Sequence, residues 1–305
     1  MKKDLLSVSD LTRQEAEQLI EEAVRMKKEG APPLLAGKTM ALLFEKPSLR
    51  TKVSFQLAMH QLGGHSVYLA PEEVGLGRRE PVADVARVLS RYVDGITART
   101  FAQGTLLTLA DRSSIPVINA LSDAEHPCQA LADLLTIYEK KSRFTGLTLA
   151  YVGDGNNVAN SLLLAACLVG VDFHCASPAG YTIAEEVLNS AREFAAQSGS
   201  RIRLTESAQE AARDADVIYT DVWTSMGQEA EAEKRRQVFA AFRVDEGLLG
   251  LAREDVLFMH PLPAHPGEEI AQGLLDDSRS VVFDQAENRL HLQKALLARM
   301  LKPRQ

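Results

Sequence analysis

The stretch Phe44-Glu-Lys-Pro-Ser-Leu-Arg-Thr-Lys-Val-Ser-Phe55 decides how the first half of the chain is organised. It follows the apolar run 38–44, which predicts a buried strand. After it, apolar residues recur at helical spacing until Gly63-Gly64. The turn between strand and helix, residues 47–51, presents hydroxyl groups, a guanidinium and backbone N–H groups at a helix N-terminus. Because such an end carries about half a positive charge, the turn predicts an anion-binding site.

Length and composition describe a two-domain globular protein. A chain of 305 residues exceeds what one core usually supports, and 46% hydrophobic with 25% charged residues is ordinary for the class. The net charge of −7 argues against general nucleic-acid binding, which needs a basic face. Three cysteines without CxxC spacing predict neither a disulfide framework nor a structural zinc site. No apolar run is long enough to span a bilayer, and we expect a cytoplasmic protein.

Strand and helix patterns alternate along the whole chain, which predicts an α/β fold. We expect two doubly wound domains, each with a mostly parallel sheet flanked by helices, joined by long helices. The expected domains are 1–137 and 138–285, with the C-terminal helix 286–305 packing back on the first. The pattern also predicts a final strand at 280–283 and a charged, glycine-containing loop at 224–243 that closes over a substrate.

Polar residues with useful chemistry follow several of the predicted strands, where ligands of open α/β sheets bind. They are Arg99, His126-Pro-Cys-Gln129, Asp221, His260-Pro-Leu-Pro263 and, in the first turn of the last helix, Arg289. Each has an ordinary structural explanation: a lone arginine at a strand end is commonly a surface ion pair. The two histidines His260 and His265 lack the spacing of a helical metal pair. Singly, none of these residues decides a function.

Together the motifs resemble the aspartate/ornithine carbamoyltransferase family over nearly the whole chain. The motifs that carry the resemblance stand in the family's order: Ser48-Leu-Arg-Thr51, His126-Pro-Cys-Gln129, Asn156-Asn157, Asp221 with Ser225-Met-Gly227, and Ala286-Glu-Asn-Arg289. All but the first two are similar to the ornithine branch of the family. Two positions depart from that branch: Leu49 replaces a threonine, and Pro261 replaces a cysteine, as in the aspartate branch.

The resemblance implies transfer of a carbamoyl group from carbamoyl phosphate to an amine, here the δ-amine of L-ornithine, giving L-citrulline and phosphate. The residues that it implies for carbamoyl phosphate binding are Ser48, Leu49, Arg50, Thr51, Arg99, His126, Gln129 and Arg289. Thr51, Arg99 and His126 would be catalytic, because they would donate to the carbonyl oxygen as negative charge develops there. Gln129 would orient the carbamoyl NH₂ group.

For ornithine, the resemblance implies the residues Asn157, Asp221, Ser225, Met226 and Leu262, with Asp221 facing the ammonium group. No metal or other cofactor is expected, so orientation and electrostatics would supply the acceleration. The family further implies a homotrimer or a multiple of trimers.

Other functions remain open at this stage. His260-Pro-Leu-Pro263 favours aspartate as acceptor, whereas Asp221 would repel its second carboxylate. Putrescine and an acylated ornithine are two further amines that the chain could carbamoylate. A different class of function is a non-catalytic protein that binds carbamoyl phosphate. The run Gly153-Asp-Gly155 after a strand is also typical of dinucleotide binding, but the third glycine and the acidic residue for a ribose are missing.

Overall fold

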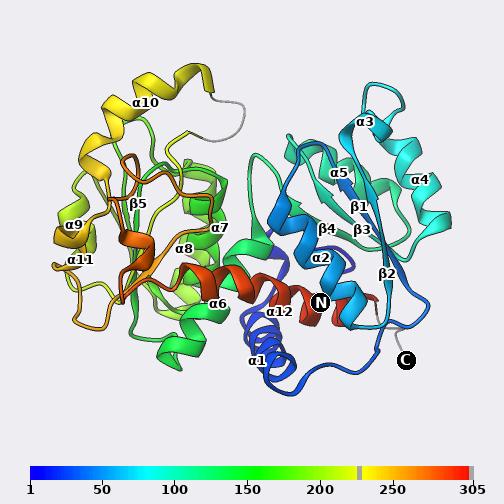
Figure 1. Ribbon diagram of the computed structural model, residues 1–305, viewed down its shortest axis with the longest axis horizontal. Helices are drawn as coiled ribbons and strands as arrows, with labels where there is room; N and C mark the ends of the chain where they lie inside the picture. The colour runs from blue at the N-terminus through cyan, green and yellow to red at the C-terminus, as the bar shows by residue number, and fades with distance from the viewer. Residues whose placement is uncertain (225–228, 302–305) are drawn as a thin grey trace. The chain divides into compact units, whose positions relative to one another are not determined.

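Two parallel sheets organise the computed structural model, which describes residues 1–224 and 229–301 (Figure 1). The chain divides into two units, one of residues 1–135 with 287–305 and one of residues 136–286. The division falls inside two helices, α6 (Pro127–Lys141) and α12 (Val282–Leu301), which each belong partly to both units. The α/β fold with parallel sheets and joining helices is therefore confirmed.

The first unit contains a four-stranded sheet in the order β2-β1-β3-β4. Its strands are β1 (Thr39–Phe44), β2 (His65–Leu69), β3 (Gly95–Arg99) and β4 (Val117–Leu121). Its other helices are η1 (Val8–Asp10), α1 (Arg13–Glu29), α2 (Leu49–Gln61), α3 (Pro71–Val74), α4 (Val82–Tyr92) and α5 (Gln103–Arg112). Strands β1, β3 and β4 are almost wholly buried, as expected of a parallel sheet covered by helices.

The second unit contains a five-stranded sheet in the order β7-β6-β5-β8-β9. Its strands are β5 (Thr148–Val152), β6 (Asp172–Ala176), β7 (Ile202–Thr205), β8 (Val217–Tyr219) and β9 (Leu257–Met259). Its other helices are α7 (Asn157–Val169), α8 (Glu185–Ser198), α9 (Ala208–Ala212), η2 (Glu229–Glu231), α10 (Ala232–Phe239), η3 (Ala240–Phe242), α11 (Glu246–Leu249) and η4 (Leu274–Asp276). Every described residue of α7 after Asn157 is buried, because this helix is apolar all round.

Two predicted elements of the second unit are wrong. The strand at 280–283 is reduced to a single bridge between Ser280 and Phe258, because α12 already begins at Val282. The apolar letters Val-Val-Phe favour a strand, but Val282 is buried on a helix face and Phe283 is 62% exposed. The described part of the predicted loop 224–243 is mostly helical, consisting of η2, α10 and η3.

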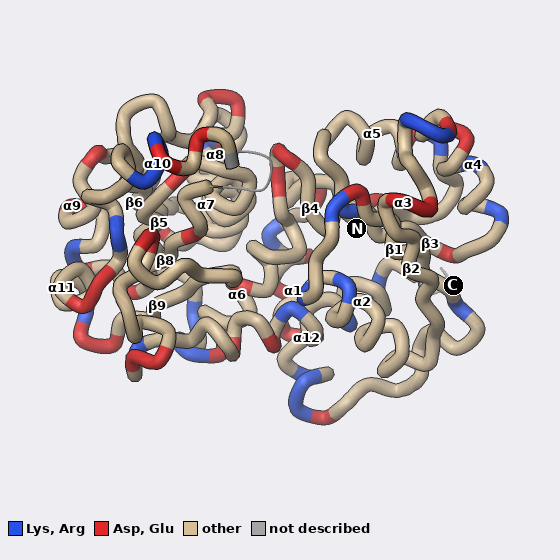
Figure 2. The backbone as a smooth tube through the Cα atoms, turned by 45° about the horizontal axis from the view of Figure 1, so that its top comes forward, with Lys and Arg blue, Asp and Glu red and all other residues tan. Residues whose placement is uncertain are grey.

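Charged residues of both signs occur throughout the described part of both units. Figure 2 shows acidic and basic positions interspersed along the backbone of both units. Among the described residues, no helix combines the length and apolar character that crossing a bilayer requires.

Candidate active site

The first of two candidate sites lies at the carboxyl edge of the four-stranded sheet, in the first unit. The register pairs Phe44, the last residue of β1, with Arg99, the last residue of β3. Arg99 is in turn paired with Leu121, at the end of β4. The chain connections run in opposite directions from β1 and β3, so the loops after these strands meet at the switch point where α/β sheets bind ligands.

Thr51 is the centre of this first site. Ser48 is the N-cap of α2, and its hydroxyl accepts a hydrogen bond from the backbone N–H of Thr51 and donates to Thr51 Oγ1 at 3.0 Å. From α12, Arg289 Nη2 donates to the same Oγ1 atom at 2.7 Å. Thr51 is fully buried, so these contacts fix its side chain. Two residues of the predicted set that are 238 positions apart in sequence, Thr51 and Arg289, are thereby in direct contact.

Cations without carboxylate partners surround this hydroxyl pair. The side chains of Arg50 and Arg99 form no ion pair among the described residues, and the Nε atom of each is buried without a hydrogen-bond partner there. Burial, followed by the charges of Arg289 and Arg50, lowers the pKa of Arg99 from 12.5 to about 10. Because like charges this close are unfavourable, the site is electrostatically complementary to an anion.

Lys46 adds a cation that the sequence patterns did not indicate. Its Nζ atom lies 5.0 Å from the ring centroid of Phe101, in the loop after β3. Burial and the charge of Arg99 lower the pKa of Lys46, and Lys46 in turn lowers the pKa of His126. The lysine stands in the opening stretch, three residues before Leu49, but only the fold brings it within electrostatic reach of Arg99.

His126 and Gln129 stand at the start of α6, both buried. Burial, then Arg289 and Arg99, hold the pKa of His126 well below 6.5, so the imidazole is neutral at pH 7 and its single N–H group is a neutral donor. Gln129 Nε2 donates to Asp133 Oδ1 at 2.8 Å, which leaves Oε1 as the acceptor of the side chain. This Oε1 atom is buried and accepts no hydrogen bond from the described residues. Gln129 therefore offers an acceptor for an NH₂ group.

The second candidate site lies at the carboxyl edge of the five-stranded sheet, in the second unit. Strands β5, β8 and β9 end side by side, since Tyr151 is paired with Tyr219 and Tyr219 with Met259. Asp221 follows β8 and is 7% exposed. Burial raises the pKa of Asp221, although His260 and a hydrogen bond from Asn156 act in the opposite direction.

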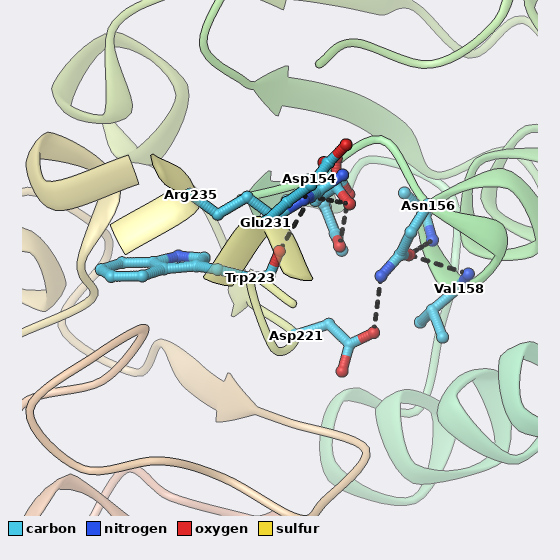
Figure 3. Close-up of polar contacts among 9 residues, drawn as sticks. Asp154, Asn156, Val158, Asp221, Trp223, Glu231 and Arg235 are labelled. Carbon is cyan, nitrogen blue, oxygen red and sulfur yellow. Dashed lines mark hydrogen bonds and ion pairs between the residues drawn. The ribbon is translucent and has the colours of Figure 1, made fainter. Parts of the chain in front are cut away.

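Asn156, the neighbour of the predicted ornithine-binding residue Asn157, contacts Asp221. Its Nδ2 atom donates to Asp221 Oδ2 at 2.8 Å, while its Oδ1 atom accepts from the N–H groups of Val158 and Ala159 as the N-cap of α7 (Figure 3). Asn157 is the first residue of the helix and is partly buried. The sequence alone does not tell which of two adjacent asparagines is the N-cap, because the cap position depends on where the helix begins.

The turn after β9 brings Leu262 to the same edge. Leu262 has a φ of 55°, and its backbone N–H donates to His260 Nδ1 at 2.9 Å. The Nε2 atom of His260 lies 3.3 Å from Glu269 Oε1, so the buried imidazole is held from both sides. The predicted ornithine residues Ser225 and Met226 lie outside the described residues.

The glycines of the suspected dinucleotide motif have a structural explanation. A Cβ atom on Gly155 would lie 2.4 Å from the backbone nitrogen of Ile183 and from the carbonyl carbon of Thr182. The glycine thus allows the turn after β5 to pack against another backbone segment.

Two family descriptions match the chain, one over each unit. The description "Aspartate/ornithine carbamoyltransferase, carbamoyl-P binding domain" matches residues 3–139, and "Aspartate/ornithine carbamoyltransferase, Asp/Orn binding domain" matches residues 145–300. The residues expected to bind carbamoyl phosphate, apart from Arg289 on α12, lie within the carbamoyl-P binding match. The residues expected to bind ornithine lie within the Asp/Orn binding match.

Relatives and solved structures agree with these family matches. A protein called ornithine carbamoyltransferase from Anoxybacillus flavithermus is 53% identical over 304 residues, which cover 98% of this chain and 96% of the relative. The structure of ornithine carbamoyltransferase from Pyrococcus furiosus is 50% identical, with a TM-score of 0.95 over 99% of this chain and 98% of the other. An acetylornithine transcarbamylase structure, complexed with acetylcitrulline, is 32% identical with a TM-score of 0.90 over 99% of this chain and 100% of the other. By its sequence, its fold and both of its matched domains, the chain belongs to the aspartate/ornithine carbamoyltransferase family.

Proposed function

We propose that this protein transfers the carbamoyl group of carbamoyl phosphate to the δ-amine of L-ornithine, giving L-citrulline and phosphate. The proposal is supported by full-length relatives at about half identity that carry the name ornithine carbamoyltransferase. The observation that carries it is the group of arginines around the buried Thr51, at the N-terminus of α2.

Carbamoyl phosphate fits the candidate site of the first unit by charge and by hydrogen bonding. Its phosphate group would bind at the N-terminus of α2, where Ser48, Leu49, Arg50 and Thr51 offer backbone and side-chain donors, together with Arg289. A dianion there would relieve the repulsion that Arg50 and Arg289 exert on Arg99.

The carbonyl group would lie between donors and one acceptor. Thr51, Arg99 and His126 would donate to the carbonyl oxygen, where negative charge grows as the amine attacks. Because His126 is neutral, it stabilises that charge by a hydrogen bond without giving up its only proton. Gln129 Oε1 would accept from the carbamoyl NH₂ group, which distinguishes a carbamoyl group from an acetyl group.

The amino-acid acceptor would bind at the candidate site of the second unit. Asp221 would pair with the α-ammonium of ornithine, and Asn157 and the Leu262 backbone would bind further polar groups of the substrate. The attacking δ-amine must be neutral, although a primary alkylamine has a pKa of about 10.4. Loss of its proton before attack is therefore part of the reaction, and desolvation favours it.

The acceptor is tested by measuring carbamoylated product with L-ornithine, L-aspartate, putrescine and N-acetylornithine in parallel. We expect turnover with ornithine and a kcat/KM at least about a hundredfold lower for the others, because a misplaced or missing charge leaves a buried group unpaired. Turnover with aspartate alone would contradict the proposed acceptor, and no turnover with any amine would favour a binding protein.

We propose that the protein forms a homotrimer or a multiple of trimers, and that it works in the cytoplasm. Its support in this chain is an apolar stripe on α2, formed by Leu49, Val53 and Leu57 at intervals of four residues. These side chains are 76%, 42% and 41% exposed, whereas a helix covering a sheet usually presents polar residues outward. The stripe also gives a role to Leu49, whose side chain does not contribute to the anion site.

A further inference from the structure

A buried arginine on α10 joins the ends of two strands in the second unit. Arg235 is 6% exposed, and its Nη1 atom donates to Asp154 Oδ2 and to the carbonyl oxygen of Trp223, both at 2.8 Å. Figure 3 shows the guanidinium reaching from its helix to both acceptors. Asp154 follows β5 and Trp223 follows β8, so a single side chain ties two adjacent strand ends together.

Aromatic rings hold the guanidinium in one orientation. Its central carbon lies 5.0 Å from the ring centroid of Tyr181 and 6.0 Å from that of Phe239. Phe239 also stacks on the indole of Trp223, with centroids 6.0 Å apart and planes inclined by 25°. Phe239 thus packs against both partners of one hydrogen bond, the Arg235 guanidinium and Trp223. This packing restricts the movement of the donor and of the acceptor.

The bonds made by Arg235 flank the contact between Asn156 and Asp221. Asp154 lies two residues before Asn156, and Trp223 lies two residues after Asp221. The hydrogen bond from Asn156 to Asp221 and the bonds from Arg235 therefore connect the same two segments at neighbouring points (Figure 3). A change at Arg235 would alter the separation of these segments and hence the direction of the Asp221 carboxylate.

Stability alone does not account for this arrangement. A buried ion pair gains little over well-packed apolar residues, because two charges must be removed from water. Burial raises the pKa of Asp154 even though Arg235 acts to lower it, so the carboxylate is not fully compensated. An arginine here does what an apolar residue could not do, since the two N–H groups of its Nη1 atom reach acceptors that follow different strands.

We propose that Arg235 is a positioning residue for the amino-acid substrate, acting through Asp154 and the Trp223 carbonyl to aim Asp221 at the substrate ammonium. This inference rests on the proposed function, because it takes ornithine as the ligand of Asp221. It adds Arg235 and Asp154 to the residues that determine affinity for the acceptor, although neither touches it.

The test uses Arg235→Gln, Asp154→Asn and the double variant in the full-length enzyme. We expect each single change to raise the KM for ornithine by roughly ten- to a hundredfold, because a small displacement of a binding group has effects of this size. The Kd for carbamoyl phosphate, measured by calorimetry, should stay within about twofold of the wild-type value. The double variant should resemble the worse single variant, because both changes break one connection.

Two further variants separate positioning from folding. Arg235→Lys keeps the charge and the donors but is shorter and loses the planar group beside the Tyr181 and Phe239 rings. It should therefore recover part of the ornithine affinity, and it remains testable if Arg235→Gln does not fold. The matched control is Arg201→Gln, which breaks the exposed ion pair of Arg201 with Asp172 in the same unit and should leave both substrate constants unchanged.

Trp223 supplies a readout that does not depend on turnover. It is the only tryptophan of the chain and is 2% exposed. Its emission should shift to longer wavelength in Arg235→Gln and Asp154→Asn, but not in Arg201→Gln. An unchanged KM for ornithine in Arg235→Gln would overturn the inference, as would an equal loss of affinity for both substrates. If the wild-type enzyme does not carbamoylate ornithine, the proposed function fails instead, and the emission shift still reports on the contact.

Discussion

Replacing Arg99 by methionine should stabilise the substrate-free protein while abolishing carbamoyl transfer. Arg99 is 6% exposed, makes no ion pair with the described residues, and stands among other cations. Methionine has a similar length and no charge, so it can occupy the same space without the repulsion. The substitution therefore separates what this side chain contributes to folding from what it contributes to the site.

The magnitude follows from the pKa of Arg99, which falls from 12.5 to about 10 on folding. At pH 7 the guanidinium is charged in both states, but the folded state holds the proton less tightly, so the charge destabilises folding. A difference of about 2.5 in pKa corresponds to about 3 kcal/mol, which is an upper value because methionine also loses packing. This destabilisation persists at neutral pH and diminishes only as the pH rises through about 10 towards 12.5.

Urea unfolding at pH 7, in buffer without phosphate, measures the effect. We expect Arg99→Met to raise the free energy of unfolding by about 1–3 kcal/mol, and added inorganic phosphate to stabilise the wild type more than the variant. Arg201→Met is the control, because Arg201 is exposed and its ion pair with Asp172 raises its pKa, so its loss should not stabilise. A variant that is less stable than the wild type without phosphate would refute the reasoning.

Three other predictions test the two candidate sites and the assembly. Thr51→Val removes the hydroxyl that accepts a hydrogen bond from Arg289. Because a hydrogen bond to a charged group contributes about 1.5–3 kcal/mol, the Kd for carbamoyl phosphate, measured by calorimetry, should rise ten- to a hundredfold. An unchanged Kd would exclude this role. Burial raises the pKa of Asp221 above 3.8. As the pH falls, the wild type should therefore begin to lose affinity for ornithine before pH 3.8 is reached. Asp221→Asn, which has no carboxylate to titrate, should bind ornithine weakly at every pH. Identical pH profiles for the two proteins would count against the ammonium pairing. Val53→Glu should reduce the mass measured by sedimentation equilibrium, whereas Val88→Glu, at a valine 45% exposed on α4, should not; equal masses would remove the support for an interface at α2.

The repeated elements of this fold could be predicted from the sequence because burial and periodicity act locally. Strand β3 covers 95–99, a short apolar run that begins at a glycine and is buried throughout. Strand β4 begins at Val117, which pairs with Ile96, although the apolar letters before it begin at Ile115. Pro116, which lacks an N–H group, stands just before the first paired residue.

The proximity of single residues was predictable only where a motif named them. Ser48, Thr51 and Arg289 stand in short motifs, and they are in direct contact through the threonine. Lys46 and Arg235 belong to no such motif, and each acts through partners that are distant in sequence. A lysine before a proline and an arginine in a charged helix are common in sequences and indicate no function by themselves. Whether these side chains are buried depends on the order of the strands, which the local sequence does not give.

The distinction between Asn156 and Asn157 shows where local reasoning stops. Both residues precede the apolar run of α7, and either could serve as its N-cap. The structure places Asn156 at the cap, where its Oδ1 atom accepts two backbone N–H groups and leaves only its Nδ2 atom for Asp221. The amide is thereby oriented by the helix itself, which directs its NH₂ group to the carboxylate. Substituting aspartate at Asn156 would preserve the cap but place two carboxylates in contact, which makes this position sensitive to charge in a way that no helix pattern reveals.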